Sequence, residues 1–323
     1  MKRLHFFELF TLLNLIAVAL FAHASLFLLG DILRVFGSLV LAIAGQALLG
    51  IIIRAAIALL RKERSYLRRL RRRAWLLDTV RLVFFNALMI FTYGWLKLIV
   101  PLYRHSNFDG VLWELDRVLG FGVAPSVFLL DLFTGALRFV DWSYANIFYA
   151  SIFVASVFFL SHPSRRIRIA FTNGNSALWL IGAWLYFLVP SLGPAYRFPE
   201  IWFAHSESLR ITQGLQALLM RNWQNVLRAW SHEPAGPISI AFGIAAFPSL
   251  HVAIQTYVFL WMRRLWLSGQ VLFGVFALAI FLGSMITGWH YLIDGLAGLL
   301  MAWIVFRFAS KRARPPFRLA GSA

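Results

Sequence analysis

Long apolar segments alternate with short charged segments along the whole chain. A helix needs about 20 mostly apolar residues to cross the hydrocarbon core of a bilayer, so segments of this length predict membrane-spanning helices. Eight such segments are present: Leu9–Leu29, Val35–Leu60, Val80–Val100, Tyr144–Leu160, Ile169–Leu192, Leu250–Trp266, Val271–Thr287 and Tyr291–Phe308. The pattern predicts an all-α integral membrane protein with about eight transmembrane helices. The first segment lacks a clear cleavage site for a signal peptidase, so we expect it to be retained.

The composition supports a membrane protein and excludes several classes of chemistry. Hydrophobic residues make up 60% of the 323 residues and charged residues only 14%, which no ordinary soluble domain matches. The formal net charge of +18 would indicate a nucleic-acid partner in a soluble protein, but the apolar composition argues against nucleic acid. The chain has no cysteine, which excludes disulfides, cysteine-ligated metals and thiol nucleophiles.

The distribution of Lys and Arg predicts the orientation in the membrane. With the N-terminus in the cytoplasm and eight alternating spans, nineteen basic residues fall on inner segments and eight on outer segments. The densest run, Arg61–Arg73, is therefore interpreted as a topology anchor that lies on anionic lipid. The predicted location is a membrane, with a bacterial inner membrane favoured by the charge bias and the missing cysteines.

Two outer segments, Pro101–Ser143 and Gly193–Phe247, are much longer than the other connections, and long loops often carry function. Within the second, Leu209–Trp230 spaces apolar residues among Arg, Gln and Asn, which predicts an amphipathic helix at the interface. It is expected to lie flat over a lipid site.

The first long outer segment contains the charged stretch FDGVLWELDRVLGFG. Acidic and basic residues at helical spacing usually form local ion pairs on a solvated helix. We therefore expect a solvated helix here, with its charges exposed on Asp109, Glu114, Asp116 and Arg117.

Asp294 is the only acidic residue after Glu233, and it lies within an apolar segment. A lone carboxylate in a membrane helix is costly, so it indicates a function and a nearby partner. In WHYLID, His290 precedes Asp294 by four residues, which places both side chains on one helix face. The carboxylate can then fix the tautomer of the imidazole and leave its second nitrogen basic. Alone, this pair slightly favours a structural histidine at the membrane interface, satisfied by a nearby carboxylate.

A second histidine is predicted at the same depth. In AAFPSLHVA, Pro248 and Ser249 indicate a helix start, and His251 follows in the first turn of the sixth span. Between His251 and His290 the chain is predicted to cross the membrane once toward the cytoplasm and once back. Both histidines are therefore expected at the outer face. A helix N-terminus there also suits a phosphate.

Two histidines and one carboxylate without cysteine are suited to phosphoryl transfer through a phosphohistidine. One histidine attacks phosphorus, the carboxylate stabilises its charged form, and the other histidine protonates the leaving oxygen. Cationic or N–H donors must hold the phosphate oxygens. A metal site is the competing use of these residues, but three ligands would be a sparse set; the prediction is therefore no metal and no cofactor.

PSLH followed by GSMITGWHYLID resembles the second and third signature motifs of the type-2 phosphatidic acid phosphatase superfamily, which comprises integral-membrane lipid phosphatases and phosphotransferases. The resemblance covers roughly Val80–Phe308, with PSLGPAYRFP in the place of the first motif. It implies a six-helix phosphatase-like core, to which the first two spans add an N-terminal hairpin. By resemblance, His290 is the nucleophile and Asp294 its orienting partner.

The resemblance also implies that His251 protonates the leaving group, that Ser249 binds phosphate, and that Arg197 is the basic residue of the first motif. Two family cations are replaced here, a Lys by Pro190 and an Arg by Ser284. The first motif also differs in that Phe198 separates Arg197 from Pro199. The candidates to supply the missing charge are Arg104, Arg117 and Lys97.

A third motif without Arg and a Pro-rich first motif resemble the inositol phosphorylceramide synthase branch, whose members transfer a phospho-headgroup between lipids. The sequence therefore predicts a metal-independent lipid phosphatase or phospho-headgroup transferase that acts at the outer, periplasmic or extracellular, face. Its partners would be a lipid phosphate or phospho-headgroup lipid and membrane lipids, with no nucleic acid. The alternative is a transporter in which His290 and Asp294 relay protons.

The chain is expected to divide into three parts. Residues 1–78 would form the N-terminal transmembrane hairpin and a basic cytoplasmic loop, residues 79–310 the six-helix catalytic domain, and residues 311–323 a basic cytoplasmic tail.

Overall fold

The computed structural model describes residues 4–21, 29–104 and 107–313, and within these ranges the fold is all-α, without a strand. Each of the eight predicted spans coincides with a long helix: α1 Phe6–Phe21, α2 Leu29–Leu60, α4 Arg73–Tyr103, α7 Leu137–Leu160, α8 Arg165–Leu188, α12 Leu250–Leu265, α13 Gln270–Ile286 and α14 Leu292–Arg312. The end of the first predicted span, residues 22–28, lies outside the described residues. The predicted all-α membrane fold is confirmed.

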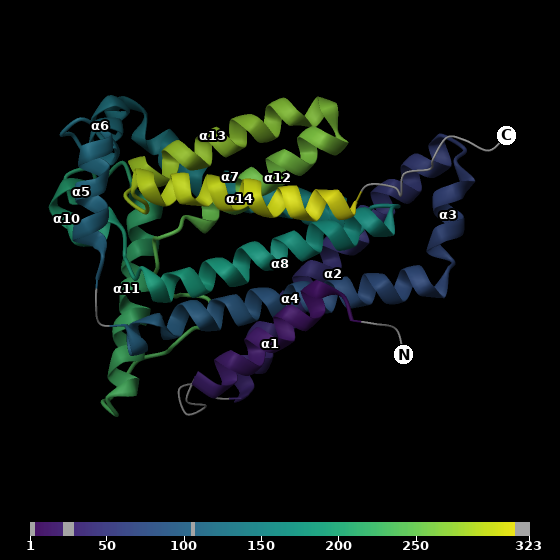
Figure 1. Cartoon of the computed structure of the whole chain (residues 1–323), viewed down its shortest axis with the longest axis horizontal. Helices are drawn as coiled ribbons and strands as arrows, with labels where there is room; N and C mark the ends of the chain where they lie inside the picture. The colour runs from purple at the N-terminus through teal and green to yellow at the C-terminus, as the bar shows by residue number, and fades with distance from the viewer. Residues whose placement is uncertain (1–3, 22–28, 105–106, 314–323) are drawn as a thin grey trace.

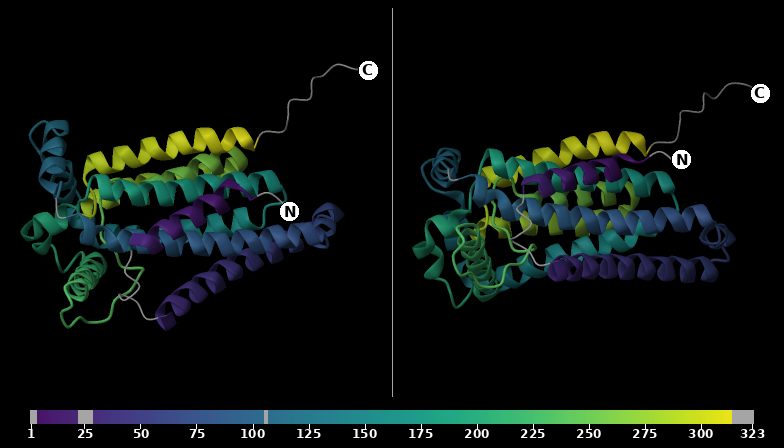
Figure 2. Two further views of the ribbon diagram at one scale, coloured as in Figure 1. Left: turned by 60° about the horizontal axis from the view of Figure 1, so that its bottom comes forward. Right: turned by 90° about the horizontal axis from the view of Figure 1, so that it is seen from below.

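Length and apolar composition qualify four helices in the described ranges to cross a membrane. These are α2, α4, α7 and α14; α1 and α13 are apolar but shorter. The long helices run side by side as an elongated bundle, as Figures 1 and 2 show. Because side chains on the outside of such a bundle face lipid, many large apolar residues are exposed, among them Leu41, Leu60 and Val271.

Helix α12 lies at the centre of the bundle and packs against α7, α8, α13 and α14. Its inward face is aromatic, and Tyr257 and Trp261 are completely buried. Phe171 of α8 packs between this face and Phe159 of α7, with the two phenylalanine rings stacked 3.6 Å apart. This rigid centre holds the start of α12, and therefore His251, in a fixed position.

Helices α1 and α2 flank α4. Helix α1 packs mainly on α4 and α8, whereas α2 packs mainly on α4 and α7. Helix α4 runs without interruption through residue 78, the predicted boundary between the N-terminal part and the catalytic domain. The division into three parts stays a prediction.

The two ends of the bundle differ in charge and in structure. The basic connections between α2 and α4 and between α7 and α8 lie at one end with the basic end of α14, together with the short helix α3, Arg64–Leu70 (Figure 1). The short 3₁₀ helix η3, Leu267–Gly269, joins α12 to α13. The two long connections gather at the other end and form α5 Asp109–Leu119, α6 Pro125–Leu132, η2 Thr134–Ala136, α9 Pro194–Arg197, α10 Pro199–Phe203 and α11 Arg210–Trp230.

The predicted amphipathic segment is confirmed as a helix, α11, which crosses the end of the bundle at a steep angle to the long helices (Figure 1). Its buried face is largely polar and binds the loops beneath it. Gln216 donates a hydrogen bond to the carbonyl of Thr287, and Asn222 donates to the carbonyls of Ser239 and Phe242. Helix α11 therefore fastens the loops at this end of the bundle.

Candidate active site

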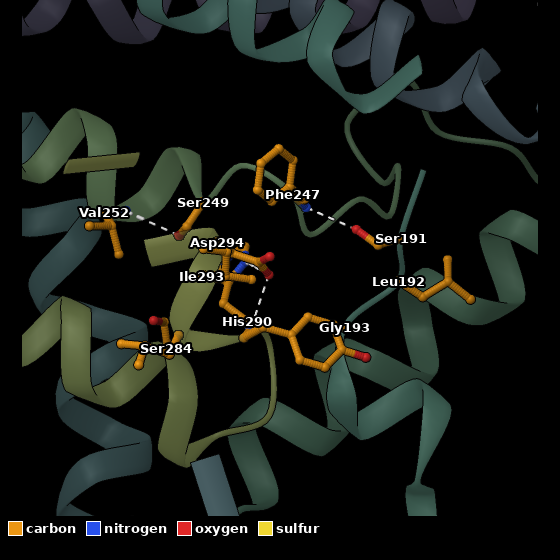
Figure 3. Close-up of polar contacts among 12 residues, drawn as sticks. Ser191, Leu192, Gly193, Phe247, Ser249, Val252, Ser284, His290, Ile293 and Asp294 are labelled. Carbon is orange, nitrogen blue, oxygen red and sulfur yellow. Dashed lines mark hydrogen bonds and ion pairs between the residues drawn. The ribbon is translucent and has the colours of Figure 1, made fainter. Parts of the chain in front are cut away.

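His290 and Asp294 come together at the start of α14, as predicted, but His290 lies in the loop before the helix and not on its face, because α14 begins at Leu292. The imidazole Nδ1 lies 3.4 Å from Oδ2 of Asp294, and both side chains are buried, with 4% and 0% exposure (Figure 3). The same carboxylate oxygen accepts the backbone N–H of Tyr291, so Asp294 also caps its own helix. The imidazole also makes a hydrogen bond with the backbone of Ala246, so both the carboxylate and the loop before α12 orient the ring.

The second histidine lies beside the first. His251 is the second residue of α12, and its ring centroid is 5.8 Å from that of His290. The ring of Phe148 packs on His251 at 4.4 Å and fixes its position. The structure thus joins two histidines that are 39 positions apart in the chain, at the end of the bundle where the sequence predicts them.

Ser249 caps α12, as predicted. Its hydroxyl accepts the backbone N–H of Val252 at 3.4 Å, and the residue is fully buried. Its own backbone N–H donates to the carbonyl of Asp294 at 3.0 Å. The second and third predicted motifs are therefore in direct contact through Ser249 and Asp294, which are labelled side by side in Figure 3. A role of Ser249 in binding phosphate stays a prediction.

A tight loop between α13 and α14 presents His290. Gly288 has a φ of +75°, a conformation that residues with a side chain rarely adopt, and a Cβ there would meet Trp202 at 2.6 Å. The carbonyl of Ser284 accepts the backbone N–H groups of both Trp289 and His290. Ser284 therefore holds the backbone of the histidine.

The structure contradicts the predicted exposure of Asp109. It was expected to be exposed on a solvated helix, but it is completely buried at the start of α5. Its two carboxylate oxygens accept the backbone N–H groups of Leu192 and Gly193, each at 2.8 Å, and the hydroxyl of Tyr291 at 2.8 Å. One carboxylate therefore links the first-motif loop, residues 190–199, to Tyr291, the residue that follows His290.

Asp116, two turns further along α5, is a second correction. It is also completely buried, and it accepts the backbone N–H groups of Leu292 and Ile293, at 2.7 and 3.0 Å. Burial raises the pKa of Asp116 to about 6, while these two N–H groups act in the opposite direction, so the carboxyl group is mainly ionised at neutral pH. Asp116 satisfies the free N–H groups at the start of α14, next to the catalytic candidates.

The other two charged residues of this stretch are exposed, as the sequence predicts. Glu114 and Arg117 form an exposed ion pair at 3.3 Å on the outer side of α5. Asp109 and Asp116 are seven residues apart and share the buried face of the helix with Leu112. Two carboxylates on the apolar side of an amphipathic helix are the sequence signal that could have identified them.

The first-motif loop contacts both histidine motifs. The hydroxyl of Ser191 accepts the backbone N–H of Phe247 at 3.0 Å, a bond drawn in Figure 3. Gly193 has a φ of +109°, and a Cβ there would lie 2.4 Å from the carbonyl oxygen of Trp289, so only glycine fits this position. All three predicted motifs therefore converge, although they are far apart in the chain.

Arg197 is placed differently from the histidines. It is the last residue of α9, its side chain is exposed, and its guanidinium packs near the ring of Phe198 at 5.5 Å. The structure records no hydrogen bond or ion pair of Arg197 with His251, His290 or Asp294. A role of Arg197 in binding phosphate stays a prediction.

The three candidate replacement cations occupy different surroundings. Arg117 pairs with Glu114 at the surface, and Arg104 is exposed at the end of α4. Lys97 lies two turns before Arg104 on the same face of α4, and its charge acts on the imidazoles of both His251 and His290. Its ammonium group lies 5.7 Å from the centre of the Tyr186 ring. Lys97 makes no ion pair with any carboxylate in the described part of the chain.

A cavity of about 220 Å³ lies between the end of α4 and helix α11. Arg104 and Asn107 line its outer part, and Ser191 and Ile244 border the loops that contact the histidine motifs. Trp223 and Leu227 of α11 form an apolar wall. The cavity therefore has a polar side and an apolar side next to the three converging motifs.

Comparison with known proteins gives one family. A family model described as the PAP2 superfamily matches residues 110–308, which is more than half of the chain and includes Arg197, Ser249, His251, His290 and Asp294. The match begins after α4 and directly after Asp109, so it is shorter at its start than the expected Val80–Phe308. No curated protein and no solved structure matches the chain.

Proposed function

The chain belongs to the PAP2 superfamily, which supports a phosphatase-like function in a membrane protein, and we propose that it cleaves or transfers a phosphate-linked group on a lipid through a phosphohistidine on His290. The observation that carries this proposal is the arrangement of His251, His290 and Asp294, with the imidazole rings 5.8 Å apart and the carboxylate on Nδ1 of His290. With the carboxylate on Nδ1, Nε2 of His290 would act as the nucleophile.

The reaction has two balanced steps. In the first, Nε2 of His290 forms a bond to phosphorus, the bond from phosphorus to the leaving oxygen breaks, and His251 gives that oxygen a proton. Asp294 stabilises the positive charge that the imidazole gains. In the second step, water or an acceptor alcohol attacks phosphorus and gives its proton to His251. The bond to Nε2 breaks, and both histidines return to their starting states.

We further propose that Lys97 holds the phosphate in place of the two family cations that this chain lacks. A phosphate beside the two histidines needs further cationic or N–H donors to hold its oxygens. Lys97 is the candidate whose charge reaches both histidines, and it has no carboxylate partner among the described residues. Arg104 would guide the phosphate at the mouth of the cavity, and Ser249 and Arg197 would contribute once substrate has entered.

Replacing Lys97 with glutamine is expected to lower kcat/KM by about 100-fold to 1000-fold, the usual cost of losing one charged donor to a transition state. The variant should also bind orthovanadate, a structural analogue of phosphate, more weakly. Lys97→Arg should retain more activity because it keeps the charge.

Arg117→Gln serves as a charge-matched control for Lys97→Gln and is measured with the same lipid phosphate. An unchanged kcat/KM in Lys97→Gln, or an equal loss in both variants, would show that the phosphate anchor lies elsewhere. A loss of activity with unchanged vanadate affinity would assign Lys97 a structural role.

The proposed substrates are lipids whose phosphate lies at the membrane interface, including lipid phosphates, prenyl pyrophosphates and phospho-headgroup lipids. The inositol phosphorylceramide synthase-like branch, and with it transfer to an alcohol in place of hydrolysis, stays a prediction. The transporter alternative requires a relay near the centre of the bilayer. His290 precedes the first residue of α14 and lies at one end of the bundle, which favours the enzyme.

The direct test measures phosphate release by the purified protein in detergent, with a panel of lipid phosphates and pyrophosphates. We expect release from at least one lipid, with the same rate in the presence of a chelator because no step needs a metal ion. A rate that requires added magnesium or zinc would contradict the phosphohistidine mechanism. If no lipid releases phosphate, a labelled phospho-headgroup lipid and candidate acceptor alcohols test transfer, and failure of both assays would contradict the proposed function.

A further inference from the structure

A basic cavity lies at the end of the bundle opposite the histidines. It has a volume of about 890 Å³ and is enclosed by α3, the start of α4, the start of α8 and the chain before α1. Five arginines line it, Arg68, Arg69, Arg72, Arg81 and Arg165, together with His5, Trp75 and Asp78. The cavity therefore has a large excess of positive charge.

The charges within this cavity are only partly balanced. Arg81 forms a hydrogen-bonded ion pair with Glu8, and Arg165 binds Asp78 through two hydrogen bonds. Arg69 donates to the carbonyl of Pro163.

The side chains of Arg68 and Arg72 make no hydrogen bond or ion pair with any described residue, although both residues line the cavity. Two guanidinium groups are therefore available to an anion.

A sixth arginine lies behind the cavity wall. Arg168 is almost fully buried, and its guanidinium stacks on Trp75 at 4.5 Å and donates to the hydroxyl of Thr79. Its Nε and Nη1 atoms have no hydrogen-bond partner in the structure. A buried, incompletely paired cation next to a wall residue adds to the attraction that an anion experiences in the cavity.

The position of the cavity indicates a ligand that is partly in the membrane. The lining residues Asp78 and Arg81 belong to α4, a membrane-crossing helix, and the neighbouring α4 residues Leu77 and Val80 are exposed, with 47% and 66% exposure. An anionic lipid can place its phosphate among the arginines and its acyl chains along this apolar surface. A free phosphate would use only the first of these contacts.

We propose that the cavity binds the phosphate headgroup of an anionic phospholipid, with Arg68 and Arg72 as its main ligands. This is a second lipid site, separate from the histidines by the length of the bundle, and it does not depend on the proposed function. Its occupant would hold α3 and the ends of α4 and α8 together. The basic run from Arg61 to Arg73 then contains a specific binding site in addition to its role in membrane orientation.

The test uses the full chain in nanodiscs made from equal parts of phosphatidylcholine and phosphatidylglycerol, with retained lipid identified by native mass spectrometry. The variant is Arg68→Gln with Arg72→Gln. The control is Arg71→Gln with Arg73→Gln, which removes the same charge from exposed positions in the same segment that do not line the cavity.

We expect the natural sequence and the control to retain phosphatidylglycerol preferentially, and the cavity variant to lose this preference by about tenfold. If both double variants lose the preference for phosphatidylglycerol equally, the preference comes from general surface charge, and the proposal is overturned. Displacement of the lipid by inorganic phosphate in detergent would also overturn it, because the ligand would then be the free anion. Retention of phosphatidylglycerol in the cavity variant would have the same consequence.

Discussion

Replacing His290 with alanine is expected to lower turnover by several powers of ten, because the variant has no nitrogen that can form the phosphoenzyme. The fold should be retained. The backbone N–H of His290 still binds the carbonyl of Ser284, and Oδ2 of Asp294 still accepts the backbone N–H of Tyr291. The measurement is kcat with the best lipid of the panel, together with unfolding of both proteins in detergent.

His232→Ala is the matched control, since His232 is exposed and lies outside the converging motifs. It should be as active as the natural sequence. A labelled substrate gives an independent result: an acid-labile, base-stable phosphoenzyme should form with the natural sequence and be absent from His290→Ala. Near-normal turnover in His290→Ala, or a phosphoenzyme that still forms, would assign the nucleophile to another residue.

The helices and the histidine pair were predictable because their signals are local. Apolar length located the eight spans, and the start of α12 followed from Pro248 and Ser249. The pair of His290 and Asp294 followed from a four-residue spacing. In each case the information lies within one short stretch of the chain, so a pattern along the sequence is sufficient to recover it.

The carboxylates of α5 were missed because their partners are remote in sequence. Asp109 binds Gly193, 84 residues away, and Asp116 binds Leu292, 176 residues away. Nearby Glu114 and Arg117 supplied a local pairing that suggested a solvated helix. The influence of the Lys97 charge on both histidines likewise depends on how α4 packs against α8 and against the loop that contains Gly243, which no spacing within α4 reveals.

Replacing Asp109 with alanine is expected to destabilise the protein by about 3 kcal/mol or more. The substitution leaves the backbone N–H groups of Leu192 and Gly193 and the hydroxyl of Tyr291 without their acceptor, and each unpaired buried donor costs about 1–3 kcal/mol. Because Tyr291 follows His290 directly, the same change should loosen the histidine and lower kcat at temperatures where the variant is still folded.

Asp109 would act as a positioning residue, which a graded series can test. Asn at position 109 keeps one oxygen that can accept a hydrogen bond, so Asp109→Asn should lose less stability and less activity than Asp109→Ala. Glu114→Ala removes a carboxylate from the exposed side of the same helix and should change the unfolding free energy by less than about 1 kcal/mol.

Unfolding by sodium dodecyl sulfate in mixed micelles gives the free energies of this series, and kcat and KM are measured on the folded proteins. If Asp109→Ala is as stable as Glu114→Ala, the buried carboxylate of Asp109 does not link the loops, and the prediction is wrong. Loss of stability with unchanged kcat would separate the two effects, because Asp109 would then support the fold without positioning His290.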